Sequence, residues 1–169
     1  MLATVLKPNG TLPIQMGWDG AYTKLEFVGG PYDAFPGRKV AFGVCVRAER
    51  TTRESSDVWV PIKDFGVPKN AVVVEHALKG ALQAALAGRQ VYVGCMGGWG
   101  RTGLFLALLA KACGTPDPIG YVRKQYSPRA VETKDQEAYV KGFDVTYLQT
   151  WLFWAAWGKR TADLFFWWR

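Results

Sequence analysis

The sequence predicts an α/β fold, with a central, mostly parallel β-sheet flanked by helices. Residues 39–46 contain a continuous apolar run, which is typical of a buried strand. A second β-rich run, residues 90–94, is followed by a glycine-rich loop and by the apolar, helix-length segment 102–113. Strands and helices that alternate in this way favour a layered α/β architecture.

The N-terminal third consists of short strands and turns. Residues 4–6 and 12–14 flank a Pro8-Asn9-Gly10 turn, a pattern typical of a β-hairpin. Residues 24–28 alternate charged and apolar side chains, so we expect another strand there. Residues 47–57 are polar and of mixed charge, and we interpret them as a surface connection.

The middle of the chain combines a short strand, a loop and a helix. Residues 58–62 lead into Lys63-Asp64-Phe65-Gly66-Val67-Pro68. A carboxylate in such a Gly/Pro-bounded loop is suited to act as a mobile acid, and the less favoured alternative is that Asp64 only caps a turn. Residues 70–88 show helical spacing, with Asn70 placed to cap the helix and Gly88 to end it. A further helix is expected over residues 118–126.

The glycine-rich loop after residue 94 carries the strongest chemical signal. A turn between a strand and a helix collects unpaired N–H groups and the positive end of the helix dipole, which together bind anions. Cys95 lies at the mouth of this turn, where a positive field favours the thiolate over the thiol. Arg101 adds a planar fork that can hold two phosphate oxygens. The phosphate-binding candidates are Met96, Gly97, Gly98, Trp99, Gly100 and Arg101.

Two other interpretations of this loop are possible. Gly98, Gly100 and Gly103 fit a dinucleotide-binding fingerprint, but that needs a second strand ending in an acidic residue about 20 positions on. Residues 114–118, Gly-Thr-Pro-Asp-Pro, break regular secondary structure and leave no apolar strand at that position. A buried structural cysteine in a tight turn would not explain an arginine at the mouth of the helix.

The spacing from Cys95 to Arg101-Thr102-Gly103 resembles the signature loop of the cysteine-dependent protein tyrosine phosphatases, including the dual-specificity branch. The family usually has histidine just before the cysteine, where this chain has Gly94. Very short phosphatases of this kind occur in bacteriophage genomes. The resemblance therefore implies a tyrosine-phosphatase-like fold and a cytoplasmic enzyme, in the host cytoplasm if it is phage-encoded.

The resemblance also implies roles for individual residues. Cys95 would attack phosphorus, Asp64 would protonate the leaving group, and Thr102 would hydrogen-bond the departing sulfur. Near residue 132 the family has a Gln-Thr-x-x-Gln pattern that positions water, which makes Glu132 and Gln136 candidates. These two could equally form a solvated pair on a helix.

A redox partner is a further expectation from resemblance. Lipid phosphatases of the phosphatase-and-tensin group have a cysteine that pairs with the nucleophile. Cys45 ends the strand that should lie next to the signature strand, so it is the candidate partner of Cys95.

Composition limits the classes of partner and cofactor. The chain has 169 residues, 49% of them hydrophobic and 21% charged, which fits one globular domain spanning residues 1–169. Three cysteines and no recognisable signal peptide favour a reducing cytoplasm. The net charge of +7 suits an anionic partner, and phosphorylated protein, nucleic acid and anionic membrane would all qualify on charge alone. With the phosphatase resemblance, we expect a phosphorylated protein or peptide and no nucleic acid. His76 is the single histidine, so no metal or cofactor is implied.

The C-terminal segment, residues 144–169, is rich in tryptophan. We expect Leu148, Trp151 and Trp154 to share one helical face. Packing of a terminal helix on the core would explain this composition, as would an oligomer interface or a peripheral membrane contact aided by nearby basic residues.

The loop composition predicts the substrate class. Arg101 is the single charge between Cys95 and Thr102, whereas phosphoinositide phosphatases of the family carry lysines in the loop. Met96 and Trp99 could lie against a phenyl ring. We therefore expect phosphotyrosine to be preferred over phosphoinositides, with phosphoserine and phosphothreonine slower.

Overall fold

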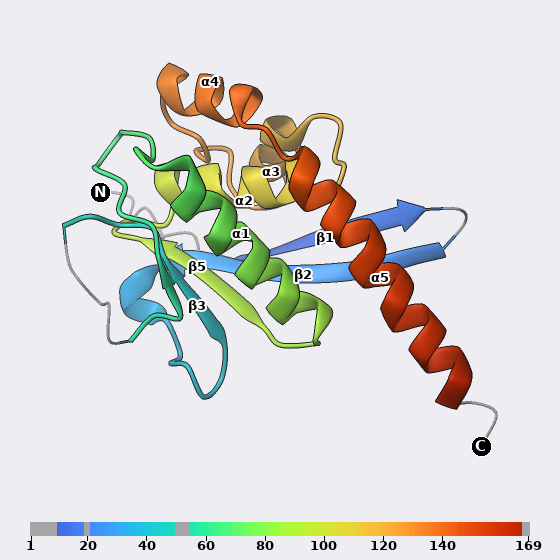
Figure 1. Cartoon of the computed structure of the whole chain (residues 1–169). Coiled ribbons are helices and arrows are strands. Elements are labelled where there is room, and N and C mark those ends of the chain that lie inside the picture. Colours follow the sequence, from blue (N-terminus) through green and yellow to red (C-terminus); the bar gives the residue numbers. More distant parts are fainter. Residues whose placement is uncertain (1–9, 19–20, 50–54, 167–169) are drawn as a thin grey trace.

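The predicted, mostly parallel sheet is present at the centre of the molecule (Figure 1). The structure is a computed structural model that describes residues 10–18, 21–49 and 55–166. Its five strands lie in the order β1-β2-β5-β3-β4. Only β1 and β2 pair in antiparallel orientation, and the other neighbours are parallel. The strands are β1 (Gly10–Trp18), β2 (Ala21–Pro31), β3 (Phe42–Cys45), β4 (Val58–Trp59) and β5 (Val91–Cys95).

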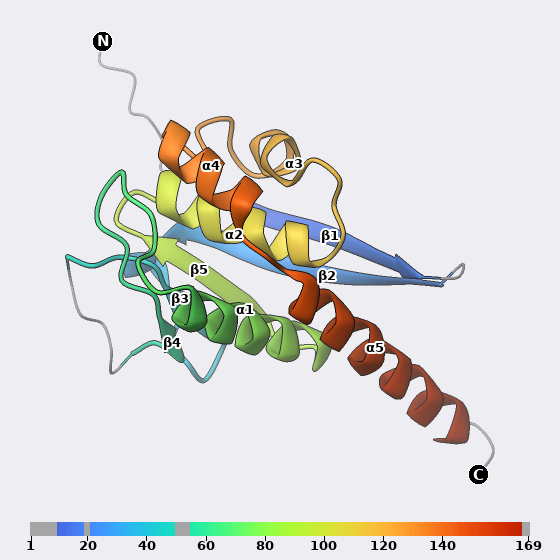
Figure 2. The same cartoon turned by 45° about the horizontal axis from the view of Figure 1, so that its top comes forward.

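Helices pack against the sheet around one central helix, α2. α1 and α2 contact the sheet directly, α4 packs against α2, and α3 contacts both α2 and β1 (Figure 2). The short 3-10 helix η1 contacts β5. The helices are η1 (Tyr32–Ala34), α1 (Ala71–Leu86), α2 (Gly100–Ala112), α3 (Pro118–Gln125), α4 (Lys134–Gly142) and α5 (Thr146–Phe166).

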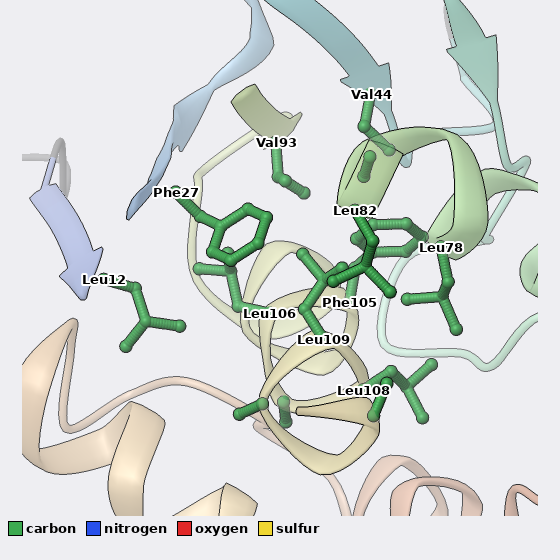
Figure 3. Packing of buried hydrophobic residues seen from close by; sticks show 14 of the residues in the cluster. Leu12, Phe27, Val44, Leu78, Leu82, Val93, Phe105, Leu106, Leu108 and Leu109 are labelled. Carbon is green, nitrogen blue, oxygen red and sulfur yellow. The ribbon is translucent and has the colours of Figure 1, made fainter. Parts of the chain in front are cut away.

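The apolar sequence of α2 follows from this central position. Every residue of the helix except Lys111 is buried. Figure 3 shows its side chains meeting those of α1 and of the sheet. The labelled members of this cluster are Leu12, Phe27, Val44, Leu78, Leu82, Val93, Phe105, Leu106, Leu108 and Leu109. A helix buried on all sides places its N-terminus rigidly at the carboxyl end of β5.

The predicted ends of helices and strands agree best with the structure where a capping residue marks them. Asn70 caps α1 as expected, because its Oδ1 accepts hydrogen bonds from the N–H groups of Val72 (3.0 Å) and Val73 (3.2 Å). The strand expected over residues 58–62 is shorter, since β4 contains only Val58 and Trp59.

The N-terminal hairpin differs from the prediction. Residues 4–6, its expected first arm, lie outside the described residues, and Gly10 already belongs to β1. β1 pairs instead with β2, with Leu12 opposite Phe27 and Trp18 opposite Ala21. The Asp19-Gly20 pair between these strands is typical of a two-residue hairpin connection and could have identified this pairing.

The tryptophan-rich helix α5 packs on the core through Leu148 and Trp151 of the predicted face, but Trp154, the third residue of that face, does not take part. Leu148 and Leu152 are fully buried, whereas Trp154 is 64% exposed and Trp157 is 52% exposed. The C-terminal end of α5 projects away from the sheet (Figures 1 and 2). Among the described helices, none is both long and apolar enough to cross a membrane. An oligomer or peripheral membrane contact of this segment stays a prediction.

Candidate active site

The loop between β5 and α2 curls around Cys95 as the sequence predicts. The Gly98 N–H donates a hydrogen bond to Cys95 Sγ at 3.2 Å. The Cys95 N–H in turn donates to Thr102 Oγ1 at 3.0 Å. Thr102 therefore contacts the main chain of Cys95 rather than its sulfur. Cys95 is only 3% exposed, so the sulfur lies at the bottom of a pocket.

Gly98 is required by the path of this loop. Its φ of +83° is a left-handed conformation that side chains disfavour. A Cβ on Gly98 would also lie 2.7 Å from the carbonyl carbon of Gly30 at the end of β2. The loop thus packs directly on the main chain of the neighbouring strand.

Arg101 is buried and held by two carboxylates. Its side chain is 3% exposed, and its Nη1 donates to both carboxylate oxygens of Glu49, at 2.5 and 2.6 Å. Its Nη2 lies 3.0 Å from Asp64 Oδ1. The sequence gives no sign of this role for Glu49, because it belongs to the polar stretch interpreted as a surface connection.

That interpretation is also wrong for Arg47, which is 1% exposed. Its Nη2 pairs with Asp33 at 2.9 Å, and its Nη1 lies 3.9 Å from the sulfur of Met96. Arg47 therefore lies beneath the loop rather than on the surface, and residues 50–54 of the same stretch lie outside the described residues.

The loop that carries Asp64 is attached to the N-terminus of α4. Gln136 is fully buried, and its Nε2 donates to the Gly66 carbonyl at 3.1 Å. Its Oε1 accepts from the Glu132 N–H at 2.9 Å. Thr133 Oγ1 donates to the Phe65 carbonyl at 3.3 Å. Gln136 therefore joins the Asp64 loop to Glu132 and is not a wall of the pocket.

The predicted residues converge on one pocket of about 250 Å³. Its polar lining combines Cys95, Arg101, Asp64 and Glu132, all predicted, with Arg129. Its other walls are Phe65, Met96, Gly97, Trp99 and Gly100. Phe65, which is 61% exposed, was missed because nothing in the sequence distinguishes it from an ordinary loop residue. A larger hollow of about 580 Å³ behind the Asp64 loop has no cysteine in its lining.

Arg129 and Glu132 approach the mouth of the loop from the segment before α4. The Arg129 guanidinium lies 4.1 Å from the centre of the Trp99 ring, a cation–π contact. Glu132 Oε1 is 3.7 Å from Arg129 Nη2. A Cβ on Gly100 would lie 2.2 Å from Glu132 Oε2, so this carboxylate packs against the first turn of α2. Glu132 is thus placed at the site, and Gln136 behind it.

Cys45 and Cys95 lie on opposite faces of the sheet. β3 does neighbour β5 as expected, but Cys45 is paired with Gly94. Paired residues of adjacent strands share a face, and the next residue along a strand points to the other. Cys95 belongs to the core cluster on the side of α2, whereas the Gly94 side faces Tyr32. A disulfide between the two cysteines would require this part of the sheet to open, so the geometry disfavours the predicted pair.

Gly94 stands where the signature loop usually has histidine, and packing gives the reason. A Cβ at this position would lie 2.8 Å from Tyr32 Cα and 2.9 Å from Tyr32 N. Backbone atoms cannot move aside as a side-chain tip can. The main chain entering η1 therefore occupies the space that a histidine would need.

Among the described residues, no group of three or more His, Cys, Asp and Glu side chains is arranged to hold a metal ion.

Solved structures with the same fold are phosphatases. Kinase associated phosphatase, with its catalytic cysteine replaced by serine, is 15% identical over 82% of this chain and 95% of its own, with a TM-score of 0.56. Tk-PTP in its active form is 23% identical over 66% of this chain and 80% of its own, with a TM-score of 0.52. This chain has the protein tyrosine phosphatase fold. PTPMT1 in complex with PI(5)P also shares this fold, at 16% identity over 77% of this chain and 94% of its own (TM-score 0.52).

Sequence comparison gives shorter matches. No protein-family model matches the chain. The uncharacterized proteins MJECL20 and MJ0215 of Methanocaldococcus jannaschii are 41% and 39% identical to it over 85 residues. These residues are 49% of this chain and 56% and 52% of the two relatives. The chain thus spans about half the length of the curated relatives it matches.

Substitution of Gly94 tests the packing argument within this phosphatase fold. We expect Gly94→Ala to lower the free energy of unfolding by about 1–3 kcal/mol, because the new methyl group would meet backbone. Chemical denaturation measures this. Gly142→Ala is the matched control, since a Cβ there meets nothing within 4 Å. Equal stability of Gly94→Ala and wild type would contradict the packing argument.

Substitution of Glu49 tests the charge contact with Arg101. Burial acts to raise the pKa of Glu49, but the hydrogen bond and charge of Arg101 outweigh it and hold that pKa below its usual range. A carboxyl with a lowered pKa stabilises the fold above its unfolded value of about 4.3 and loses this contribution as the pH falls through the folded pKa. We expect Glu49→Gln to lower Tm near about pH 7, with the difference disappearing towards about pH 3.

Thermal denaturation across this pH range measures the effect. Glu26→Gln, at an exposed position of β2, is the control. If the Tm difference between Glu49→Gln and wild type did not depend on pH, Glu49 would not stabilise the fold through its charge.

Proposed function

We propose that this chain is a phosphomonoesterase that works through a phosphocysteine intermediate. The observation that carries the proposal is the position of Cys95, whose sulfur accepts the Gly98 N–H at the N-terminus of α2. This terminus is a site for anions, because its unpaired N–H groups and the helix dipole both attract negative charge. The fold shared with solved phosphatases supports the same reaction class.

In the first step, the Cys95 thiolate attacks phosphorus and the bond from phosphorus to the leaving-group oxygen breaks. Loop amides and Arg101 hold the equatorial oxygens, and Asp64 gives its proton to the departing oxygen. Asp64 is 3.0 Å from Arg101 Nη2 in the structure. Phosphate that binds this nitrogen displaces Asp64 from it, which frees the carboxyl group to meet the leaving group.

In the second step, water attacks phosphorus and the bond between sulfur and phosphorus breaks. Asp64, now a carboxylate, accepts a proton from the water. Glu132 orients this water, because it lines the pocket and Gln136 fixes its main chain. Thr102 accepts the Cys95 N–H, which leaves its own hydroxyl proton to donate to the departing sulfur.

Substitutions of the three proposed reacting groups test this mechanism. Cys95→Ser and Arg101→Ala should abolish turnover, since each removes a group that no neighbour replaces. Asp64→Asn should slow hydrolysis of alkyl phosphates by about 10²–10⁴-fold and of p-nitrophenyl phosphate less, because a good leaving group needs no proton. Steady-state kinetics on both substrates measures this.

Asp135→Asn, at an exposed position in the first turn of α4, is the control for Asp64 and should keep full activity. If Asp64→Asn hydrolysed the alkyl phosphate as fast as wild type, Asp64 would not be the acid.

The walls of the pocket favour an aryl phosphate. Phe65, Met96 and Trp99 offer two aromatic rings and a thioether to a phenyl ring that follows the phosphate into the pocket. Arg129, whose side chain is 54% exposed, offers charge to an acidic residue beside it. We therefore propose phosphotyrosine in a protein or peptide as the substrate, with phosphoserine and phosphothreonine slower.

Kinetics on two substrate classes tests this specificity. We expect a higher kcat/KM for a phosphotyrosine peptide than for soluble phosphoinositides. Phe65→Ala should lower the value for the peptide by about 2- to 10-fold, because one aromatic contact is lost, and should leave alkyl phosphates unaffected. Trp154→Ala, an exposed aromatic on α5, is the control. A preference for the inositol substrates would reverse the assignment, and PTPMT1, which shares the fold, is solved with PI(5)P.

A second candidate function is a phosphate-binding module with little or no turnover. It is favoured by Gly94 at the usual histidine position and by the two carboxylates that already hold Arg101. With p-nitrophenyl phosphate, a burst of product without steady release would support the binding module. Steady turnover that disappears in Cys95→Ser supports the enzyme.

A further inference from the structure

The main chain of Gly98 has two partners, and only one of them takes part in the proposed reaction. Its N–H points to Cys95 Sγ at 3.2 Å. Its carbonyl oxygen accepts a hydrogen bond from the Tyr126 hydroxyl at 2.5 Å. Tyr126 therefore contacts the loop from outside the pocket, at the residue that faces the sulfur.

This second contact fixes the orientation of the next peptide unit. The described chain contains no cis peptide bond, and in a trans peptide the C=O and N–H groups point in opposite directions. With the Gly98 carbonyl turned outward to Tyr126, the Trp99 N–H is turned toward the inside of the loop. Rotation of this peptide would instead bring a carbonyl oxygen, the negative end of its dipole, toward the thiolate.

The residues of the loop itself do little to prevent that rotation. Gly98 has no side chain and a φ of +83°, and glycine adopts positive and negative φ with similar ease. A specific hydrogen bond from another element can supply the restraint that the loop itself lacks.

Tyr126 is itself firmly placed. It follows the last residue of α3, and its N–H donates to the Val122 carbonyl at 2.9 Å. Its ring packs on β2, where a Cβ at Gly29 would lie 2.7 Å from the ring. Burial, followed by the nearby charges of Cys95 and Tyr92, raises the pKa of the Tyr126 hydroxyl far above its usual value. The hydroxyl consequently keeps its proton and stays a donor at physiological pH.

We propose that Tyr126 is a positioning residue, which holds the Gly98 carbonyl out of the anion site and so preserves the thiolate form of Cys95. The inference deepens the proposed function and rests on it for the catalytic consequence. It assigns to α3 a part in catalysis without any contact with substrate.

The test compares Tyr126→Phe with Tyr121→Phe. Both tyrosines belong to the α3 region, and each donates one hydrogen bond of 2.5 Å to a main-chain carbonyl. Tyr121 donates to the Pro13 carbonyl in β1, which is outside the loop. Phenylalanine at position 126 keeps the ring that packs on Gly29, so the variant removes little besides the hydroxyl.

Two readouts are needed. The first is the pH dependence of iodoacetamide alkylation, with Cys95 identified by peptide mapping. Cys45 and Cys113 are buried, and burial raises the pKa of Cys113 to about 12, which keeps it slow to react. The second is kcat/KM for p-nitrophenyl phosphate. Arg101, Asp64, Glu132 and Arg129, the charged groups that line the pocket with Cys95, are the same in all variants.

For Tyr126→Phe we expect the alkylation midpoint to rise by roughly half to one pH unit. We expect kcat/KM to fall by about 3- to 10-fold. Tyr121→Phe should match wild type in both measurements, even where thermal denaturation shows a similar loss of stability. An unchanged midpoint in Tyr126→Phe, or an equal shift in Tyr121→Phe, would overturn the inference. Absence of turnover in wild type would refute the proposed function alone, because alkylation still reports on the loop.

Discussion

The burial of the Arg101 guanidinium is the constraint on which the site depends. A guanidinium keeps its charge in proteins, so it can be buried only with partners for its charge and its N–H groups. Glu49 and Asp64 supply that charge, and the Ile62 carbonyl accepts a further bond at 3.1 Å. These residues come from the segments after β3 and around β4. Arg101, in the first turn of α2, thus holds the Glu49 segment and the Asp64 loop together at the end of β5.

The Asp64 loop is also held by the start of α4. Gln136 and Thr133 bind the carbonyls of Gly66 and Phe65, so the Asp64 loop lies between Arg101 and the start of this helix. Phe65 and Val131 both have positive φ, at 56° and 59°, on the two sides of the junction. Such conformations persist only where surrounding contacts impose them, and they often occur at functional sites. At this junction, Phe65 is 61% exposed and lines the pocket.

The parts of the site that sequence could predict are those whose cause is local. The order of Cys95, the glycines and Arg101 specifies a strand, a turn and a helix N-terminus, and Asn70 specifies the start of α1. Glu49 and Arg129 could not be found in this way, because each acquires its place through a contact made in the folded chain. The hydrogen bonds of Gln136 depend in the same way on where the Asp64 loop lies. The same limit applies to Cys45. Its strand can be predicted from the apolar run, but the face of the sheet to which its side chain points depends on the register with β5.

The contact between Gly94 and Tyr32 ties the residue before the nucleophile to a separate part of the chain. The main chain turns there from β2 into η1, and its atoms fill the volume that any side chain on Gly94 would occupy. A histidine could be introduced only together with a new path for residues 30–32. In related sequences these two segments should therefore change together, and a signature loop grafted from a histidine-containing phosphatase would need its own β2–η1 junction to fold.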